Sequence, residues 1–303
     1  MKWIFLIFFL TSQAWAQDCN YSVNLGNFTA SVQPVAQVLP HTFTVSRPIN
    51  SSESNCPTYY AYFAKGQANS YQRLAFSGAN SLRYNLYRNV NMGNVLKDFG
   101  DAGPSEFLIG SVPQPNTPNT STMFVEVLDQ ASTFSIPPGV YTDTLPINIY
   151  ALRNNGNIEY QRSAWFTLSF TITRYAEVSI VPVNAPHDPA ATTYVMNFGV
   201  MSPQQELQAD LRVKANVPYG IWVSSLNGGQ LRKVPHTTPV PYQIKIGNTN
   251  FMTPTTSNQW VLNEGSPSSS SGRPYPLTVR LGNFGSLDDG DYEEAVTITV
   301  QAY

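Results

Sequence analysis

The chain has 303 residues, of which 17 are Lys or Arg and 19 are Asp or Glu, so the formal net charge is only −2. This balance excludes nucleic-acid binding by a basic face, and a hydrophobic fraction of 42% opposes disorder. The 23 Pro and 19 Gly favour short strands joined by turns. We therefore predict a globular, all-β protein.

The N-terminus has the pattern of a secretory signal peptide. Lys2 precedes the apolar run Trp3 to Leu10, and Ala14-Trp15-Ala16 offers the small residues that a signal peptidase requires. The run is far shorter than the roughly 20 residues that a helix needs to cross a bilayer. We assign residues 1–16 to the signal peptide and expect an exported chain with no membrane insertion.

The two cysteines, Cys19 and Cys56, are predicted to form one disulfide. An exported protein meets an oxidising compartment, and nothing else in the sequence competes for either thiol. A catalytic cysteine is therefore not expected. The bridge leaves only Gln17 and Asp18 ahead of it in the expected mature chain.

The chain contains an internal similarity. Pro138-Gly139-Val140-Tyr141-Thr142-Asp143 resembles Asp289-Gly290-Asp291-Tyr292-Glu293-Glu294, and each hexapeptide leads into a run rich in β-branched residues. Weaker echoes pair Tyr84-Asn85-Leu86-Tyr87 with Tyr242-Gln243-Ile244-Lys245, and Cys56-Pro57-Thr58-Tyr59 with Val217-Pro218-Tyr219-Gly220. Two related domains in tandem, residues 17–174 and 175–303, account for these similarities.

Strand candidates are short, rich in β-branched or aromatic residues, and bounded by Gly, Pro or Asn. In the first half they cover residues 42–47, 59–64, 82–88, 107–112, 123–128 and 141–152. In the second half they cover residues 178–183, 207–215, 220–224, 242–247, 275–281 and 292–303. Such spacing is typical of two immunoglobulin-like β-sandwiches.

The first half has one further strand candidate without a counterpart in the second. Its alternate apolar residues, which period two directs to a core, are Ala164, Phe166, Leu168, Phe170 and Ile172. The repeat therefore predicts that the second domain lacks its final strand. The residues expected along the open groove beside its last strand are Tyr292, Val296, Ile298, Val300 and Tyr303.

These features resemble the spore coat protein U-like domain, the pilin module of the archaic chaperone-usher pili of Gram-negative bacteria. The resemblance rests on Tyr84-Asn85-Leu86-Tyr87-Arg88, on Pro137 to Thr144 before a strand, and on Gly290-Asp291-Tyr292 before the last strand. It is weaker in the second domain, which lacks cysteine. In that family a pilin domain lacks its last strand, and the N-terminal extension of a neighbouring subunit fills the groove.

The resemblance implies three partners: a periplasmic chaperone, an outer-membrane usher and an adjacent pilin subunit. It implies no cofactor. A shaft subunit needs a donor of about ten or more residues, because each residue advances about 3.3 Å along a strand, and only Gln17 and Asp18 precede Cys19. We therefore expect a tip adhesin, exported through the periplasm to the end of the pilus. Residues 17–174 would be its self-completed adhesin domain, and residues 175–303 would accept the donor strand.

Such a subunit would mediate attachment, with hydrophobic surfaces as the favoured target, and biofilm formation. Two apolar regions, expected to be loops far from the linker between the domains, are the candidates for contact. They contribute Val35, Val38 and Leu39, and Met92, Val95, Leu96 and Phe99. Plugging of the sandwich ends explains these residues equally well, since large exposed apolar patches are uncommon on soluble domains.

Two other functions stay open. A carbohydrate-binding lectin at the pilus tip would use Tyr59, Tyr60 and Tyr71 with Asn69, although aromatic residues on strands more often belong to a core. A structural protein of the spore-coat type is the other alternative.

An enzyme finds little support in the sequence. The three histidines, His41, His187 and His236, show no metal-binding spacing, and no nucleophile elbow or phosphate-binding loop occurs. The aspartates on either side of Gly290 lack the spacing of a calcium loop, so we expect no metal.

Overall fold

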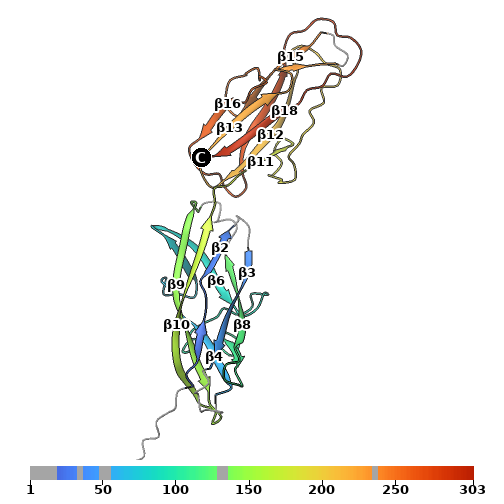
Figure 1. The fold of residues 1–303 in the computed structure, drawn as a ribbon. Coiled ribbons are helices and arrows are strands. Elements are labelled where there is room, and N and C mark those ends of the chain that lie inside the picture. Colours follow the sequence, from blue (N-terminus) through green and yellow to red (C-terminus); the bar gives the residue numbers. More distant parts are fainter. Residues whose placement is uncertain (1–18, 33–36, 48–55, 128–135, 234–237) are drawn as a thin grey trace, which may run out of the picture.

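The computed structural model describes residues 19–32, 37–47, 56–127, 136–233 and 238–303. These residues form two β-sandwiches placed end to end (Figure 1). The chain passes from one to the other between β10 (Ile158–Ile172) and β11 (Ala176–Val181). Over the described ranges there is no helix long and apolar enough to span a membrane. The predicted all-β fold is confirmed, whereas the expected signal peptide lies outside the described residues.

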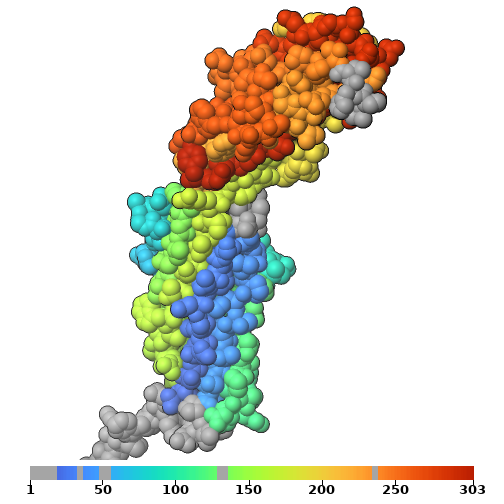
Figure 2. All heavy atoms as spheres, turned by 45° about the horizontal axis from the view of Figure 1, so that its top comes forward, coloured from blue at the N-terminus to red at the C-terminus, as the bar shows by residue number. Residues whose placement is uncertain are grey.

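The first sandwich has two layers that pack face to face. Strand pairing connects the layers at one described residue pair, Phe76 of β5 (Arg73–Ser77) with Thr142 of β9 (Gly139–Leu152). One layer contains, in order, β1 (Ser22–Asn24), β3 (Gln37–Ser46), β8 (Asn119–Val127), β6 (Asn80–Tyr87) and β5. The other contains β2 (Phe28–Val32), β10, β9, β4 (Thr58–Phe63) and β7 (Leu108–Ser111). Among these pairings only that of β2 with β10 is parallel, and Figure 2 shows the blue N-terminal strands beside the yellow-green β10.

The second sandwich repeats this plan with fewer strands. One layer contains, in order, β11, β12 (Glu206–Ala215), β17 (Arg273–Leu281), β15 (Val240–Ile246) and β14 (Gln230–Leu231). The other contains β16 (Gln259–Glu264), β13 (Tyr219–Ser225) and β18 (Val296–Ala302). The second layer is therefore narrower than its counterpart in the first sandwich.

The internal sequence similarity reflects equivalent strands. β9 follows the turn at Gly139 and pairs with β4, as β18 follows the turn at Gly290 and pairs with β13. β6 pairs with β5 and β8, as β15 pairs with β14 and β17. The sequence pattern predicted that the last strand begins at Tyr292, but it begins at Val296. β1, β2, β5, β14 and β16 were not predicted.

Each sandwich holds a carboxylate against a tyrosine at equivalent positions. Asp143 accepts hydrogen bonds from the Tyr84 hydroxyl (2.6 Å) and the Gln67 backbone N–H (3.0 Å). Burial and the nearby Asp143 charge raise the pKa of Tyr84 well above its usual value, which keeps the phenol a donor. In the second sandwich Glu294 accepts from the hydroxyls of Ser225 (2.6 Å) and Tyr242 (3.5 Å). The first pair joins β6 and β9 of opposite layers, whereas Glu294 lies just before β18.

The predicted disulfide between Cys19 and Cys56 is confirmed, with the two Cα atoms 5.9 Å apart. The Cys19 N–H donates to Gln161 Oε1 (2.8 Å), near the start of β10. Gln161 lies roughly 35 Å along the strand from Ile172, at about 3.3 Å per residue. The bridge therefore lies at the end of the first sandwich that is remote from the second.

Replacing Gly66 by Ala tests the setting of the buried Asp143. Gly66 has φ +72°, and a Cβ there would overlap the Asp143 carboxylate. Gly78 has φ +58°, and a Cβ there would meet no atom within 4 Å. We expect Gly78→Ala to cost about 1 kcal/mol through its left-handed backbone, and Gly66→Ala about 2 kcal/mol more through the overlap.

The measurement is urea unfolding of the mature chain, in which circular dichroism monitors the transition of the first sandwich. Gly78→Ala is the matched control, because it carries the backbone strain alone. Equal losses for the two variants would show that the contact between Gly66 and Asp143 does not constrain the fold.

Candidate functional site

The strand β18 has one unpaired edge. It pairs with β13 along residues 296–302, and within the described ranges no strand pairs with its other side. Its core-facing residues Ile298 and Val300 are only half-buried, and Val296 is 36% exposed. The equivalent strand β9 has fully buried residues at Leu145 and Ile147. The last strand of the second sandwich is therefore incompletely covered.

In the first sandwich β10 provides that cover. It lies between β9, to which it is antiparallel, and β2, to which it is parallel. The predicted strand from Ala164 forms the C-terminal part of β10. Of its alternate residues, Ala164 is partly buried and the others are buried: Phe166, Leu168, Phe170 and Ile172. One strand thus closes the groove between β9 and β2.

The second sandwich has a cavity of about 600 Å³ at the equivalent place. Its floor is the inner face of β15 and β17, including Ile244 and Leu277, and one wall is formed by Val296 and Ile298 of β18. The opposite wall is the segment 194–201. The cavity therefore runs along the free edge of β18.

The segment 194–198 lies in the chain between β11 and β12, as β2 lies between β1 and β3. Met196 and Phe198 pack against the second core. Val195, which precedes Met196, points outward and is 87% exposed. β2 shows the same alternation, with Phe28 and Val32 buried. The segment makes no strand pairing within the described structure. It is thus an unpaired counterpart of β2, and the cavity is the space between it and β18.

Two polar atoms of residues that line this cavity are buried without a partner in the described structure, the Tyr292 hydroxyl and Glu294 Oε2. Burial and the neighbouring Glu294 charge raise the pKa of Tyr242 above its usual value. Of the predicted groove residues, Tyr292, Val296 and Ile298 line the cavity. Tyr303 does not line it, and its backbone N–H donates to the Pro218 carbonyl.

The first predicted adhesive region is not a loop at the free end of the sandwich. Val38 and Leu39 lie in β3, where they pair with Glu126 and Val125 of β8, and Leu39 packs against the core. Val35 lies outside the described residues. The parallel pairing of Val32 with Ile172 also places the end of β2 beside the linker, rather than far from it.

The second predicted region, after Arg88, is only partly available for contact. Leu96 is fully buried in the first core, and its backbone N–H donates to the Leu86 carbonyl (2.8 Å), which holds this connection against the sandwich. Val95 bridges to Tyr87 and is half-buried. Met92 and Phe99 are 39% and 43% exposed. This part of the prediction is therefore wrong for Leu96, and exposure supports it for Met92 and Phe99 alone.

Phe99 belongs to a group of aromatic rings on the outer face of β4, β9 and β10. It stacks on Tyr150 with ring centroids 4.5 Å apart. The members, each in contact with another, are Tyr60, Tyr62, Phe99, Phe107, Tyr150 and Tyr160, and we call them the aromatic face. The alternation of Tyr60 and Tyr62 along β4 is the one local signal for it in the sequence.

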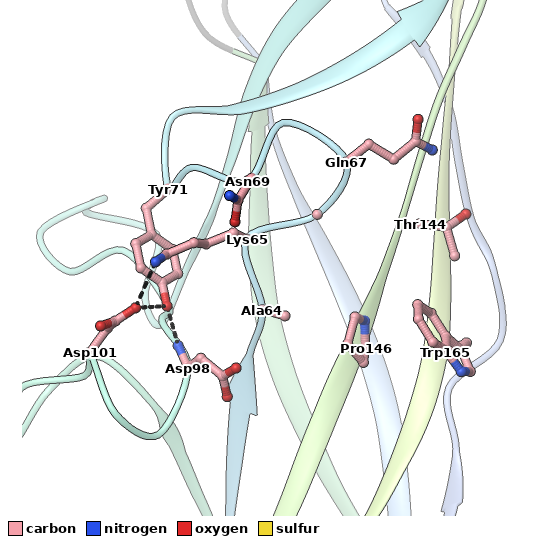
Figure 3. Close-up of a pocket in the computed structure, with 11 residues that line it drawn as sticks. Ala64, Lys65, Gln67, Asn69, Tyr71, Asp98, Asp101, Thr144, Pro146 and Trp165 are labelled. Atoms are coloured by element: carbon pink, nitrogen blue, oxygen red, sulfur yellow. Dashed lines mark hydrogen bonds and ion pairs between the residues drawn. The ribbon is translucent and has the colours of Figure 1, made fainter.

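Of the predicted lectin residues, only Tyr71 and Asn69 come together. They line a cavity of about 350 Å³ on the first sandwich (Figure 3). Tyr59 is fully buried, and its hydroxyl contacts Asn119 and Ser121, both at 2.8 Å. Tyr60 lies on the aromatic face. No group of three or more His, Cys, Asp or Glu side chains in the described ranges is placed to hold a metal.

A family comparison matches the first part of the chain. Residues 7–148 match the family model described as the Spore Coat Protein U domain, which is 142 of the 303 residues. The match confirms the resemblance seen in the sequence over these residues, whereas no curated protein sequence matches the chain.

Three adhesin structures are among the solved structures to which this chain is similar. One is a chain of the CsuC-CsuE chaperone-tip adhesion subunit pre-assembly complex from archaic chaperone-usher Csu pili of Acinetobacter baumannii. It is 14% identical to this chain, with a TM-score of 0.49, and the match covers 92% of this chain and 100% of that one. The CupB6 tip adhesin from Pseudomonas aeruginosa is 10% identical, with a TM-score of 0.38, covering 93% and 94%. CfaE, the adhesive subunit of CFA/I fimbria of enterotoxigenic Escherichia coli, is 12% identical, with a TM-score of 0.31, covering 92% of both chains.

Proposed function

We propose that this protein is the tip adhesin subunit of an archaic chaperone-usher pilus. The first sandwich attaches to a surface, and the second joins the pilus shaft by accepting a donor strand from an adjacent pilin. The observation that carries the proposal is the cavity between β18 and the segment 194–198, at the place that β10 fills in the first sandwich. The match of residues 7–148 to the Spore Coat Protein U family model supports the same role.

The equivalence with β10 defines how the donor strand would lie. It would run antiparallel to β18 and parallel to residues 194–198, which would then become a paired strand like β2. Its alternate apolar side chains would enter the cavity, each contributing about 1.5 to 3 kcal/mol on burial, and its backbone would pair with the free edge of β18. The donor would be an apolar–polar alternating segment.

The same free edge explains the need for a chaperone. An unpaired strand with half-covered apolar residues is a template for aggregation. We therefore propose that a periplasmic chaperone covers β18 after export and that an outer-membrane usher directs the exchange for the donor strand. The final location would be the extracellular end of a Gram-negative pilus.

The place of the first sandwich supports a terminal position. Its groove is filled by its own β10, so it has no need of a partner strand. Its Cys19–Cys56 bridge lies at the end that is remote from the second sandwich. Binding to hydrophobic surfaces and biofilm formation are part of the proposal, and the exposed Met92 and Phe99 support them. A structural coat role would not require one closed and one open groove.

A covalently attached donor strand tests the open groove. A copy of the turn 153–157 followed by a copy of residues 163–172 is appended after Tyr303, so that the copied apolar residues fall on the core-facing side of the added strand. We expect the unfolding temperature of the second sandwich to rise by about 10 °C, because 1 kcal/mol shifts a domain of this size by several degrees. The β18 amides should also gain protection from hydrogen exchange.

The matched control carries Ser at the three appended positions copied from Phe166, Leu168 and Phe170. It keeps the length and the backbone of the added strand but removes the side chains that would fill the cavity. Equal behaviour of the two fusions, or no change in β18 protection in the apolar fusion, would contradict the open groove.

The closed groove of the first sandwich predicts that residues 17–174 fold alone. All layers of that sandwich are supplied within this segment. We expect a monomer with a cooperative thermal transition, measured by circular dichroism and size-exclusion chromatography. A fragment without a transition would show that the first sandwich needs the rest of the chain.

Attachment to hydrophobic surfaces is tested with the double substitution Met92→Ser and Phe99→Ser. Both side chains are exposed, so the fold should be kept while binding of pili to polystyrene falls severalfold. Val200→Ser, at a residue that is 97% exposed in the second sandwich, is the control for a general loss of surface apolarity. Unchanged attachment with normal piliation would remove Met92 and Phe99 from the adhesive surface.

A further inference from the structure

The cavity of about 350 Å³ on the first sandwich lies at the small end of the range of ligand pockets, roughly 300 to 1,000 Å³. It lies between the connection from β4 to β5 and the outer face of β9 and β10. Trp165 and Pro146, which pair across these two strands, form one side. Lys65, Tyr71 and Asp101 form the other (Figure 3). Trp165 and Pro146 are thus held by the rigid sheet.

Trp165 offers a free aromatic surface to this pocket. Trp165 is 69% exposed, although it belongs to the long paired strand β10. Trp260 in the second sandwich is also exposed, at 58%, but its indole N–H donates to Asn263. A large ring left in water at the edge of a cavity is a surface on which an apolar face of a ligand gains by stacking.

The opposite side of the pocket is polar and held in place. The Asp101 carboxylate accepts from Lys65 Nζ and from the Tyr71 hydroxyl, both at 3.0 Å. The Asp98 N–H donates to the same Tyr71 oxygen (2.9 Å). Asp98 also accepts a hydrogen bond from the Asn148 side chain (2.9 Å). These bonds orient the carboxylates before any ligand arrives.

Two amide side chains of the pocket are available for a ligand. Gln67 and Asn69 are exposed, and their side chains make no hydrogen bond within the described residues. Asn69 has φ +50°, and its N–H donates to the Gly66 carbonyl (3.1 Å), so a turn holds its backbone. A side-chain amide offers both a donor and an acceptor, which is what a hydroxyl group needs.

The charges select the class of ligand. Lys65 is paired with Asp101, so the second carboxylate, Asp98, leaves the pocket with an excess of negative charge. An anion is therefore disfavoured, and a wholly apolar ligand would leave the amides and carboxylates without partners. A neutral pyranose has an apolar C–H face and a rim of hydroxyls, and it matches both sides.

We infer that this pocket binds a neutral pyranose ring, with one face stacked on Trp165 and hydroxyls bonded to the Asn69 and Gln67 amides. The inference deepens the proposed adhesive role of the first sandwich, on which it rests, by naming a saccharide as the ligand. It does not depend on the groove beside β18. Binding of a single ring is expected with a dissociation constant on the order of 1 mM.

The test follows the indole N–H signals of the ¹⁵N-labelled mature chain by NMR. The probes are methyl α-D-mannopyranoside, methyl β-D-galactopyranoside and methyl N-acetyl-β-D-glucosaminide. We expect at least one of them to shift the Trp165 signal saturably. Methyl β-D-galactopyranosiduronate, which carries a carboxylate on the ring of the galactoside probe, tests the exclusion of an anion, and cyclohexanol tests whether an apolar ring alone suffices; neither is expected to shift the signal saturably.

Variants separate stacking on Trp165 from general effects. Trp165→Ala should abolish the shifts of the backbone amides around Asn69, and Asn69→Ala should weaken binding severalfold, whereas Trp260→Ala should change nothing. The inference is overturned if no neutral probe gives a saturable shift at about 20 mM, if Trp165→Ala still binds, or if cyclohexanol binds as well as the glycosides. The strand-fusion experiment is unaffected by these outcomes, so failure of the sugar site and failure of the groove are distinguishable.

Discussion

How completely each sandwich covers its core depends on whether the strand after the turn at Gly139 or at Gly290 is paired on both edges. A strand inside a layer loses water from its backbone on both sides and from its inward side chains, so an absent neighbour leaves unpaired amides and half-covered apolar groups together. β9 has both neighbours, and its inward residues are fully buried. β18 has one, and Val296, Ile298 and Val300 stay partly exposed. One strand therefore accounts for the difference between two sandwiches of the same topology.

The source of the missing strand matters as much as its absence. β10 is joined to β9 by a short turn, so closure of the first sandwich is intramolecular and proceeds at a high effective concentration. In the proposed function the second sandwich would recruit its strand from another chain, so association would cost free energy in addition to the ordering of the incoming strand. A longer apolar strand would offset this cost, because each buried side chain adds to the affinity. The proposed groove would therefore favour a partner with alternating apolar residues.

Local sequence patterns predicted the elements whose contacts are regular. The period-two alternation from Ala164 to Ile172 indicated a strand, and the two cysteines indicated their bridge. The burial of Leu96 was missed because Leu96 lies in a connection with no periodic pattern, whose bond to Leu86 the sequence does not indicate. The pocket beside Trp165 was also missed: alternation with the inward residues from Ala164 to Ile172 places Trp165 on the outer face, but the pocket is completed by Lys65 and Tyr71, which are remote in sequence. Such sites depend on tertiary contacts rather than on spacing.

The topology that the two sandwiches share also places the two proposed tasks, attachment and assembly, on different sandwiches. The carboxylate–tyrosine pairs, Asp143 with Tyr84 and Glu294 with Tyr242, occupy equivalent places, yet Asp143 is completely buried whereas one oxygen of Glu294 stays unpartnered at the cavity. A closed groove lets the first sandwich hold rigid side chains such as Trp165 on its outer face. An open groove leaves the second sandwich with polar atoms, including the Tyr292 hydroxyl, for which an arriving backbone can supply partners. Because the proposed attachment surface and the groove lie on different sandwiches with separate cores, a substitution at one is expected to leave the other unchanged.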